Sequence, residues 1–524
     1  MNDHITRRRL WPGITAAVAI AGLWAMPAAA ETVLKVRPFG DLKTIDPITT
    51  SDYMVRNHGY MVYDVLFAQN AKGEIVPQMV ESYTHSDDGR SWTFVLRDGL
   101  KFSDGTPVTS ADVVASLKRW GERDGLGQQM MAHSVSLEAA DPKTVKLTLK
   151  DGWSLVLEAL GKPSSNVPFI MPERIAKTPA NENIKDPIGS GPFVMKTDEW
   201  VPGSKIVYVK SPTYEPRKEA PDGLAGGKTV KVDRVEWQVI PDAQTTLNAL
   251  QAGEIDIFEE VPPDMIGLLK DNPDVGVAKL AALQGVMRLN QLQPPFNNQK
   301  LRQAILTLVD QDPALRAYVD DPNLYTNCPS FYMCDSPYFT DAGWPKPDAE
   351  KAKQLVKESG YDGAPIVLLD ATETALHPAT LVVAQAMRDI GLNVDYQAMD
   401  WGTLSSRRTS KKPVSEGGWS AFLSGPAAPD MTEPVGHMAL RSNCDKAWFG
   451  WPCDETIETL RAEFTMAPDL AARKEIAKKI QLRAIETVPY VSVGQFYLVR
   501  GIRKDVTGLL ASGVPVYWNV AKGN

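Results

Sequence analysis

The sequence predicts an α/β fold with more than one domain, and three observations lead to that prediction. The chain has 524 residues, more than a single hydrophobic core of about 250 to 300 residues usually holds. Residues 232–258 have the pattern of a strand, a helix and a second strand, with Asp242 at the helix start and Gly253 at its end. The same pattern of a helix, a closing glycine and an apolar strand occurs in residues 347–369 and again in residues 378–401.

The first thirty residues have the pattern of a signal peptide. A basic start precedes an apolar stretch and small residues at Ala28 and Ala30, which predicts cleavage before Glu31. The arginines of residues 6–10 also fit a twin-arginine export signal, with the ordinary secretory route as the alternative. No cysteine lies near the cleavage position, and no later apolar run reaches the roughly 18 residues of a membrane span. We therefore expect a soluble periplasmic protein without a lipid anchor.

The charge balance is acidic. The chain carries a net charge of −8, and without the three arginines and one aspartate of the leader this becomes −10. Such a charge repels a polyanion, so we expect no nucleic-acid partner.

Residues 86–120 predict a hairpin followed by a helix. Apolar and other residues alternate from Trp92 to Leu96, and Asp98-Gly99 provides a tight turn after them. Thr109 can cap a helix whose third residue is Asp112. Every residue in this stretch has a structural task, so we expect scaffold here and no catalysis.

The four cysteines predict two disulfides. An even number in an exported chain favours pairing, and proximity favours Cys328 with Cys334 and Cys444 with Cys453. Loop closure of this size contributes about 2 to 3 kcal/mol each. The alternative, a four-cysteine zinc site, requires more closely spaced ligand pairs. We expect both bridges to hold surface loops.

Common signatures of catalysis and metal binding are missing from the sequence. There is no H-E-x-x-H, no G-x-S-x-G and no S-x-x-K motif. No two histidines after the leader stand four residues apart. We therefore expect no enzyme, no protein-held metal and no cofactor, although a carboxylate pair of the glycosidase kind cannot be recognised from spacing in sequence.

Several blocks, taken in order, resemble the family 5 extracellular solute-binding proteins, the oligopeptide and dipeptide class that serves bacterial ABC transporters. The resemblance covers nearly the whole chain after the leader. It is carried by residues 75–120, 187–195, 232–258, 294–311 and 348–361.

The resemblance implies a type II-like periplasmic binding protein with three α/β lobes and a ligand cleft between lobes I and III. A hinge motion would close the cleft around a peptide or peptide-like solute, and the closed monomer would deliver the solute to permease subunits at the inner membrane. The implied boundaries place lobe I at 31–75, 189–282 and 485–524, lobe II at 76–188, and lobe III at 283–484.

The resemblance also implies ligand-facing residues. Trp419 follows Gly418 as in peptide-binding relatives, but Phe422 stands where those relatives carry the aspartate that pairs with the peptide amine. Asp430 is a candidate substitute. The remaining candidates are Trp401 as a cleft aromatic, Arg407 or Arg408 as a carboxylate-binding arginine, and the first-lobe side chains Tyr53, Asn57 and His58. The alternative for Trp401 and Trp419 is a plain core position, and for the arginines a solvent-facing one.

Three functional alternatives remain open. The family also takes up opines, metal chelates, haem and oligosaccharides, and the missing aspartate favours such non-peptide solutes. A second class is a sensor or chaperone that presents its ligand to a receptor without transport. A third is a hydrolase built on the same scaffold.

Overall fold

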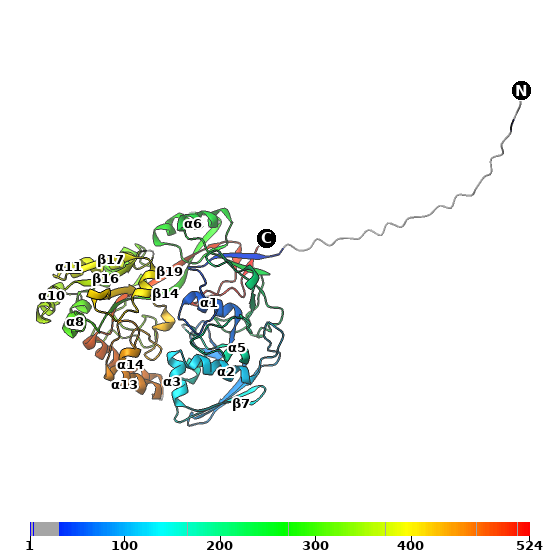
Figure 1. Ribbon diagram of the computed structural model, residues 1–524, viewed down its shortest axis with the longest axis horizontal. Helices are drawn as coiled ribbons and strands as arrows, with labels where there is room; N and C mark the ends of the chain where they lie inside the picture. The colour runs from blue at the N-terminus through cyan, green and yellow to red at the C-terminus, as the bar shows by residue number, and fades with distance from the viewer. Residues whose placement is uncertain are drawn as a thin grey trace. The chain divides into compact units, whose positions relative to one another are not determined.

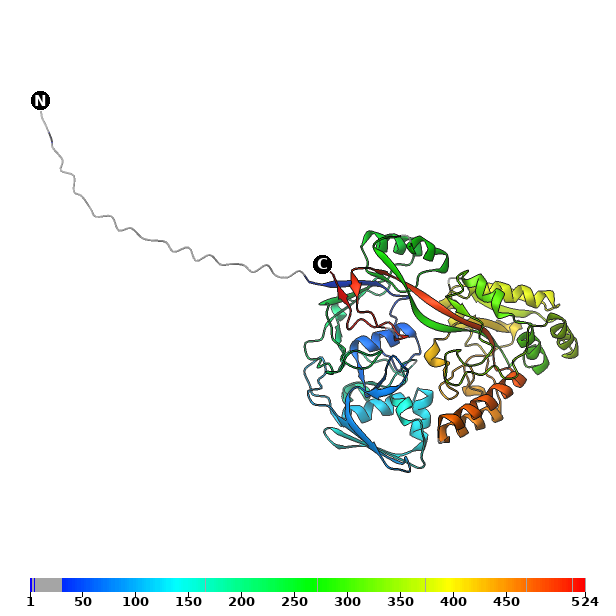
Figure 2. The same ribbon diagram turned by 180° about the vertical axis from the view of Figure 1, so that it is seen from behind.

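Two long antiparallel strands connect the two halves of the folded body. β14 (Val275–Leu289) and β19 (Val491–Arg503) pair from Val275 opposite Arg503 to Met287 opposite Val491, with irregularities near Lys279 and Gly285. One end of this ribbon pairs with β13 (Ile257–Phe258) and the other with β18 (Ala421–Ser424). Figure 2 shows the green and red strands side by side along the top of the body. Irregularities in a two-stranded connection allow bending, so this ribbon is suited to be a hinge.

The computed structural model describes residues 1, 4, 31–164, 166–270, 272–372, 374–467, 469–510 and 512–523. The chain divides into residues 1–31 and a folded body of residues 32–524. The predicted signal peptide and its twin-arginine pattern lie outside the described residues, apart from Met1 and His4. Among the helices that are described, none is long and apolar enough to cross a membrane.

The N-terminal half of the main sheet contains the predicted strand–helix–strand unit. β12 (Arg234–Gln238) and β13 both run parallel to β1 (Val33–Arg37), on opposite sides of it. The intervening helix α6 (Ala243–Ala252) begins at Asp242, whose side chain accepts a hydrogen bond from the Thr245 N–H, and ends at Gly253 in the left-handed region. The prediction for this segment is confirmed. β11 (Lys205–Lys210) and β10 (Phe193–Met195) complete this end of the sheet.

The C-terminal half continues the same sheet in the order β14, β18, β16 (Ile366–Ala371) and β17 (Val394–Met399). The predicted helices before these strands are α10 (Ala349–Glu358) and α11 (His377–Asp389), and both are confirmed. Figure 1 shows them with α8 at one side of the body. The other elements of this half are α8 (Gln299–Leu308), α9 (Gln311–Tyr318), β15 (Tyr325–Thr326), α12 (Trp401–Arg407), α13 (Glu455–Met466) and α14 (Leu470–Thr487).

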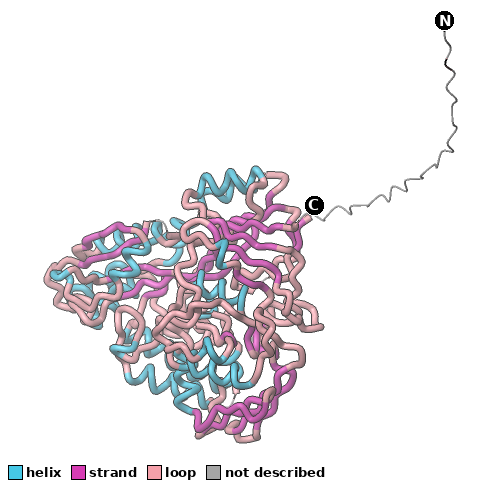
Figure 3. The backbone as a smooth tube through the Cα atoms, turned by 45° about the vertical axis from the view of Figure 1, so that its right-hand side comes forward, coloured by secondary structure: helices cyan, strands magenta, loops and turns pink. Residues whose placement is uncertain are grey.

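A separate four-stranded sheet has the order β5 (Val80–His85), β6 (Ser91–Leu96), β8 (Thr144–Leu149) and β7 (Ser134–Asp141). It forms the magenta group at the lower edge of the body in Figure 3. The predicted hairpin partner was wrong, because β6 pairs with the preceding β5 and with β8, while Asp98-Gly99 is a turn that leads away from the sheet. The predicted cap is confirmed: Asp112 accepts a 2.7 Å hydrogen bond from the Thr109 N–H at the start of α2 (Ser110–Gly121).

Short elements connect these layers. They are α1 (Tyr53–Val62), β2 (Asp64–Val65), β3 (Phe67–Gln69), β4 (Ile75–Pro77), α3 (Gly125–His133), α4 (Val156–Leu160), β9 (Phe169–Ile170), α5 (Glu173–Ala176), α7 (Ile266–Lys270), β20 (Val506–Thr507) and β21 (Ala521–Lys522). β14 crosses the lobe boundary expected near residue 282. The lobe boundaries therefore stay predictions.

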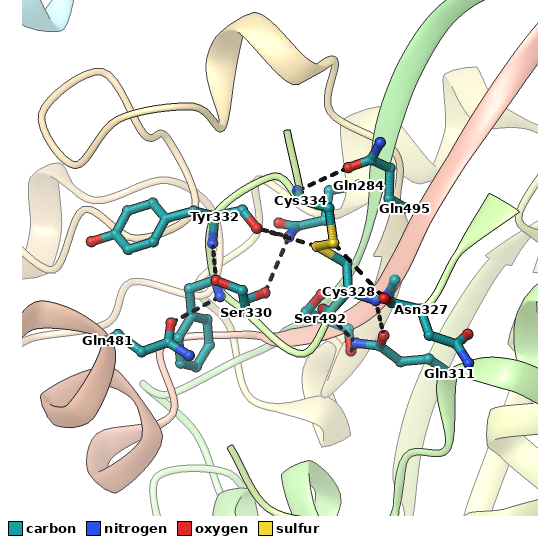
Figure 4. Close-up of a disulfide and its surroundings, with 12 residues drawn as sticks. Gln284, Gln311, Asn327, Cys328, Ser330, Tyr332, Cys334, Gln481, Ser492 and Gln495 are labelled. Atoms are coloured by element: carbon teal, nitrogen blue, oxygen red, sulfur yellow. Dashed lines mark hydrogen bonds between the residues drawn. A yellow bond between two sulfur atoms is a disulfide. The ribbon is translucent and has the colours of Figure 1, made fainter. Parts of the chain in front are cut away.

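Both expected disulfides are present, Cys328–Cys334 and Cys444–Cys453. The expectation that they hold surface loops was wrong for the first, because Cys328 is fully buried. Figure 4 shows that glutamine side chains surround this bridge. Gln311 donates to the Cys328 carbonyl at 2.9 Å, and Gln495 of β19 accepts from the Cys334 N–H at 3.0 Å. The first bridge thus fixes its loop against the hinge ribbon.

Candidate ligand cleft

A cavity of about 320 Å³ lies between N-terminal and C-terminal segments of the folded body. We call this cavity the cleft. Its N-terminal wall consists of Ser51, Arg123, Asp124, Gly125, Leu126, Lys162 and Asn166. Its C-terminal wall consists of Asp430, Gly436, Met438, Arg441, Lys446, Ala447, Trp448, Phe449 and Trp451. A concave site with aromatic walls and a few charged groups is typical of small-molecule recognition.

Asp430 is hydrogen-bonded to two residues of the N-terminal half. Its Oδ2 accepts from the Tyr53 hydroxyl at 2.6 Å and from the Ser164 hydroxyl at 2.9 Å. The Tyr53 oxygen also accepts from the Ala427 N–H at 2.9 Å. Burial, with the Asp430 charge as the next cause, raises the pKa of Tyr53 well above its ordinary value, so the phenol remains a donor. The structure therefore brings together two of the predicted site residues, Tyr53 and Asp430.

Helix α1 explains the position of Tyr53. Asp52 caps the helix by accepting from the Met54 N–H at 2.7 Å, which leaves Tyr53 as its first residue. The Arg56 guanidinium lies 4.3 Å from the centre of the Tyr53 ring and donates to Ser164 at 2.8 Å. Arg56 thus holds both hydroxyl donors that reach Asp430, although sequence analysis did not single it out.

The other two first-lobe candidates lie inside the N-terminal core. Asn57 is 1% exposed, and its Oδ1 accepts from Arg56 at 2.9 Å. His58 is fully buried with its Nδ1 2.9 Å from the Tyr208 hydroxyl, and burial lowers its pKa to about 3. Their predicted ligand contacts stay predictions.

The second disulfide closes the loop that supplies the aromatic wall. Trp448, Phe449 and Trp451 lie between Cys444 and Cys453. From β14, the buried Arg288 donates to the carbonyls of Trp448 at 3.2 Å, Ala439 at 2.6 Å and Phe449. Gly450 has a φ of 97°, and a Cβ there would lie 2.6 Å from the Leu289 carbonyl oxygen, so only glycine fits. The loop is therefore held rigidly before any ligand arrives.

Arg408 supports this wall from behind. Its guanidinium lies 4.7 Å from the Phe449 ring centre, 4.9 Å from that of Trp401 and 5.7 Å from that of Trp448. Such cation–aromatic contacts stabilise the loop, and burial lowers the pKa of Arg408 to about 10. Arg407 has a different task, because it donates to Gln397 at 2.5 Å and to the Gly418 carbonyl at 3.2 Å. The predicted carboxylate-binding role stays a prediction for both arginines.

Trp419 and Phe422 are fully buried neighbours on or beside β18. Their ring centres are 5.1 Å apart, and the Trp419 indole donates to the Ser410 carbonyl at 3.2 Å. Phe422 also packs edge-on against Trp448, with ring centres 5.7 Å apart. These contacts place both residues in the core beneath the cleft wall, so direct contact with ligand stays a prediction for Trp419 and Phe422.

Sequence analysis missed most of the charged lining of the cleft. Arg123, Lys162, Arg441 and Lys446 come from segments that are far apart in the chain, and no local motif links them. One signal was available: three aromatic residues lie within four positions between two cysteines, from Trp448 to Trp451. Among the described residues there is no cluster of three or more His, Cys, Asp or Glu side chains that could hold a metal ion.

The fold and the two-walled cleft together define a solute-binding protein, and comparison with known proteins gives the family. The family model described as bacterial extracellular solute-binding proteins, family 5 Middle, matches residues 74–441. The probable peptide ABC transporter periplasmic-binding protein y4tO of Sinorhizobium fredii is 38% identical over 99% of both chains. The glutathione-binding protein GsiB of Salmonella typhi is 28% identical over 80% of both chains.

A solved structure agrees with these relatives at the level of the fold. The dipeptide-binding protein from Pseudoalteromonas sp. SM9913, in complex with Met-Leu, matches with a TM-score of 0.79 and 19% identity, over 94% of this chain and 100% of the other. The chain belongs to family 5 of the bacterial extracellular solute-binding proteins. The resemblance and the α/β fold class predicted from sequence are confirmed.

Proposed function

We propose that this protein is the periplasmic substrate-binding component of an ABC importer, and that its cleft captures a peptide or peptide-like solute for delivery to a membrane permease. The observation that carries the proposal is a cleft with a rigid aromatic wall and charged groups contributed from both sides. A ligand that contacts both walls stabilises the closed state by its differential affinity for that state. The peptide class is supported by the names of the two sequence relatives. We further propose that the protein acts as a monomer and has no catalytic activity.

Asp430 is our candidate partner for a ligand amine. It lines the cleft although it is only 4% exposed, whereas Phe422, at the position of the family's aspartate, is fully buried and is not a lining residue. A carboxylate offers about four acceptor positions, and the Tyr53 and Ser164 hydroxyls both donate to Oδ2 of Asp430. An ammonium group in the cleft needs such a partner because an unpaired buried charge is costly.

Native mass spectrometry tests the main proposal. The protein is exported in its own host, purified without denaturation and its bound solutes are identified by fragmentation. A series of short peptides is the expected result. Failure to detect any bound peptide, together with no calorimetric binding of di- to pentapeptides, would refute the peptide class.

The amine contact has a separate test. Ala-Gln-Ala and its N-acetyl form are titrated against the wild type and against Asp430→Asn by calorimetry. The wild type should prefer the free amine at least tenfold, and the variant should lose that preference. An N-acetyl peptide that binds the wild type equally well would show that Asp430 is not the amine partner.

A non-peptide solute is the second candidate, and the burial of Phe422 favours it. Without an aspartate at this position, the usual amine contact is missing. One defined non-peptide mass in the native mass spectrum would identify the ligand as a non-peptide solute.

A further inference from the structure

The cleft is cationic although the protein as a whole is acidic. Four cationic side chains and two carboxylates, Asp124 and Asp430, line it. Asp124 is paired with Lys162, and Asp430 accepts the two hydroxyl hydrogen bonds described above. The net charge of the chain is −8. A local excess of positive charge in a protein with a negative net charge attracts anionic ligands.

Arg441 is partly buried and differs from Arg288 and Arg461 near the cleft. Arg288 donates to four backbone carbonyls, and Arg461 donates to Glu458 and to two carbonyls. Across the described parts of the chain, by contrast, the Arg441 guanidinium has no hydrogen bond and no ion pair. Burial, with the nearby Arg461 as the next cause, lowers the pKa of Arg441, while Asp124 and Glu458 oppose that effect at a distance. A guanidinium in this situation has its five donor hydrogens available.

Gly125 makes room for this guanidinium on the opposite wall. A Cβ at Gly125 would lie 1.8 Å from Nη2 of Arg441, which is far inside contact distance. Gly125 is the first residue of α3, and its conformation does not require glycine because its φ is not positive. A side chain at position 125 would therefore have to displace the Arg441 guanidinium.

We infer that the cleft selects an anionic solute and that Arg441, whose guanidinium packs against Gly125, holds a carboxylate of that solute. The fork of donors on a guanidinium matches the two oxygens of a carboxylate, which would supply the missing hydrogen bonds. Trp448 and Phe449 beside it provide an apolar surface for the remainder of the solute. This inference rests on the proposed function, because it names the class of solute within the same site.

Three tripeptides of nearly equal size test the inference by calorimetry. Ala-Gln-Ala amide has no carboxylate, Ala-Gln-Ala has one and Ala-Glu-Ala has two. Wild-type affinity should rise at least tenfold from the amide to Ala-Glu-Ala. Arg441→Gln should reduce this rise to less than threefold, and Arg441→Lys should retain part of it. Arg90→Gln, on an exposed turn away from the cleft, is the matched control and should behave as the wild type.

A second variant tests the geometry without removing the charge. Gly125→Ala should displace the guanidinium and lower the affinity for Ala-Glu-Ala about tenfold, while leaving that for the amide unchanged. In the Arg441→Gln background the same substitution should have no further effect, because the two residues act through one contact. Thermal melting of each variant shows that the protein is folded.

The outcomes separate the inference from the proposed function. Equal wild-type affinity for all three peptides, or an undiminished preference for carboxylates in Arg441→Gln, overturns the inference and leaves peptide binding intact. If none of the peptides binds, the inference fails, and the proposed function is then decided by the native mass spectrum and the titrations with di- to pentapeptides.

Discussion

The Tyr53 hydroxyl donates a 2.6 Å hydrogen bond to Asp430, a residue 377 positions further along the chain. Asp430 lies in the C-terminal wall of the cleft, Tyr53 is the first residue of helix α1 in the N-terminal half, and Ser164 donates to the same carboxylate oxygen at 2.9 Å. Hydrogen bonds to a charged acceptor are stronger than neutral ones. This contact is therefore suited to stabilise the arrangement in which the two walls enclose a ligand.

Removal of the Tyr53 hydroxyl should weaken ligand binding. A hydrogen bond to a charged group contributes about 1.5 to 3 kcal/mol, so Tyr53→Phe should lower affinity by a factor of at least about ten if the bond forms only on closure. Calorimetry with the solute identified by native mass spectrometry provides the measurement. Tyr60→Phe is the control, because the Tyr60 hydroxyl donates to the Pro163 carbonyl within one wall. An equal loss in both variants would contradict the role of Tyr53.

The substitution Phe422→Asp, which introduces the aspartate of peptide-binding relatives, should destabilise the fold. Phe422 is fully buried between Trp419 and Trp448. Phe422→Asp removes this packing and buries a carboxyl group, so the free energy of unfolding should fall by at least about 3 kcal/mol. Denaturant titration measures the change, with Phe422→Leu as a milder apolar control. A stable Phe422→Asp variant with tighter peptide binding would show that the side chain at 422 can reach the cleft.

The two disulfides should differ in their effect on binding. Replacement of either cysteine pair by serine should lower the free energy of unfolding by about 2 to 3 kcal/mol, as loop closure predicts. Loss of Cys444–Cys453 should in addition lower ligand affinity, because that bridge closes the loop with the aromatic wall. Loss of Cys328–Cys334 should have little effect on affinity. Melting curves and calorimetry on both double variants measure stability and affinity. An equal effect of the two replacements on affinity would contradict the special role of Cys444–Cys453.

Stability should decrease in acid through two buried histidines. Burial lowers the pKa of His58 and of His437 to about 3, below the ordinary value of 6.5. Because the unfolded chain then binds protons more readily than the folded one, stability should fall as the pH drops from about 6.5 towards 3. The slope approaches roughly 1.4 kcal/mol per pH unit for each histidine. Denaturant titration across this range should show a shallower slope in His58→Gln, and an unchanged slope would refute the contribution of His58.

Local patterns in the sequence were sufficient for the individual elements. The cap at Asp242, the left-handed Gly253 and the capping contact between Thr109 and Asp112 depend on residues within a few positions of one another. Their energies are local, so spacing alone predicts them. The pairing of β6 with β8 could not be predicted in this way, because β8 lies about fifty residues further along the chain.

The sequence by itself determined the α/β class, the family and the two cysteine pairs, since these follow from periodicity, block order and proximity along the chain. Only the tertiary structure decided which side chains meet in the cleft. Tyr53 meets Asp430, and Arg441 meets Gly125, across several hundred residues of chain. It also buried Phe422 and left Asp430 at the cleft. The physical reason is that a site between two walls is formed by packing of distant segments, and local sequence contains no record of which residues that packing brings into contact.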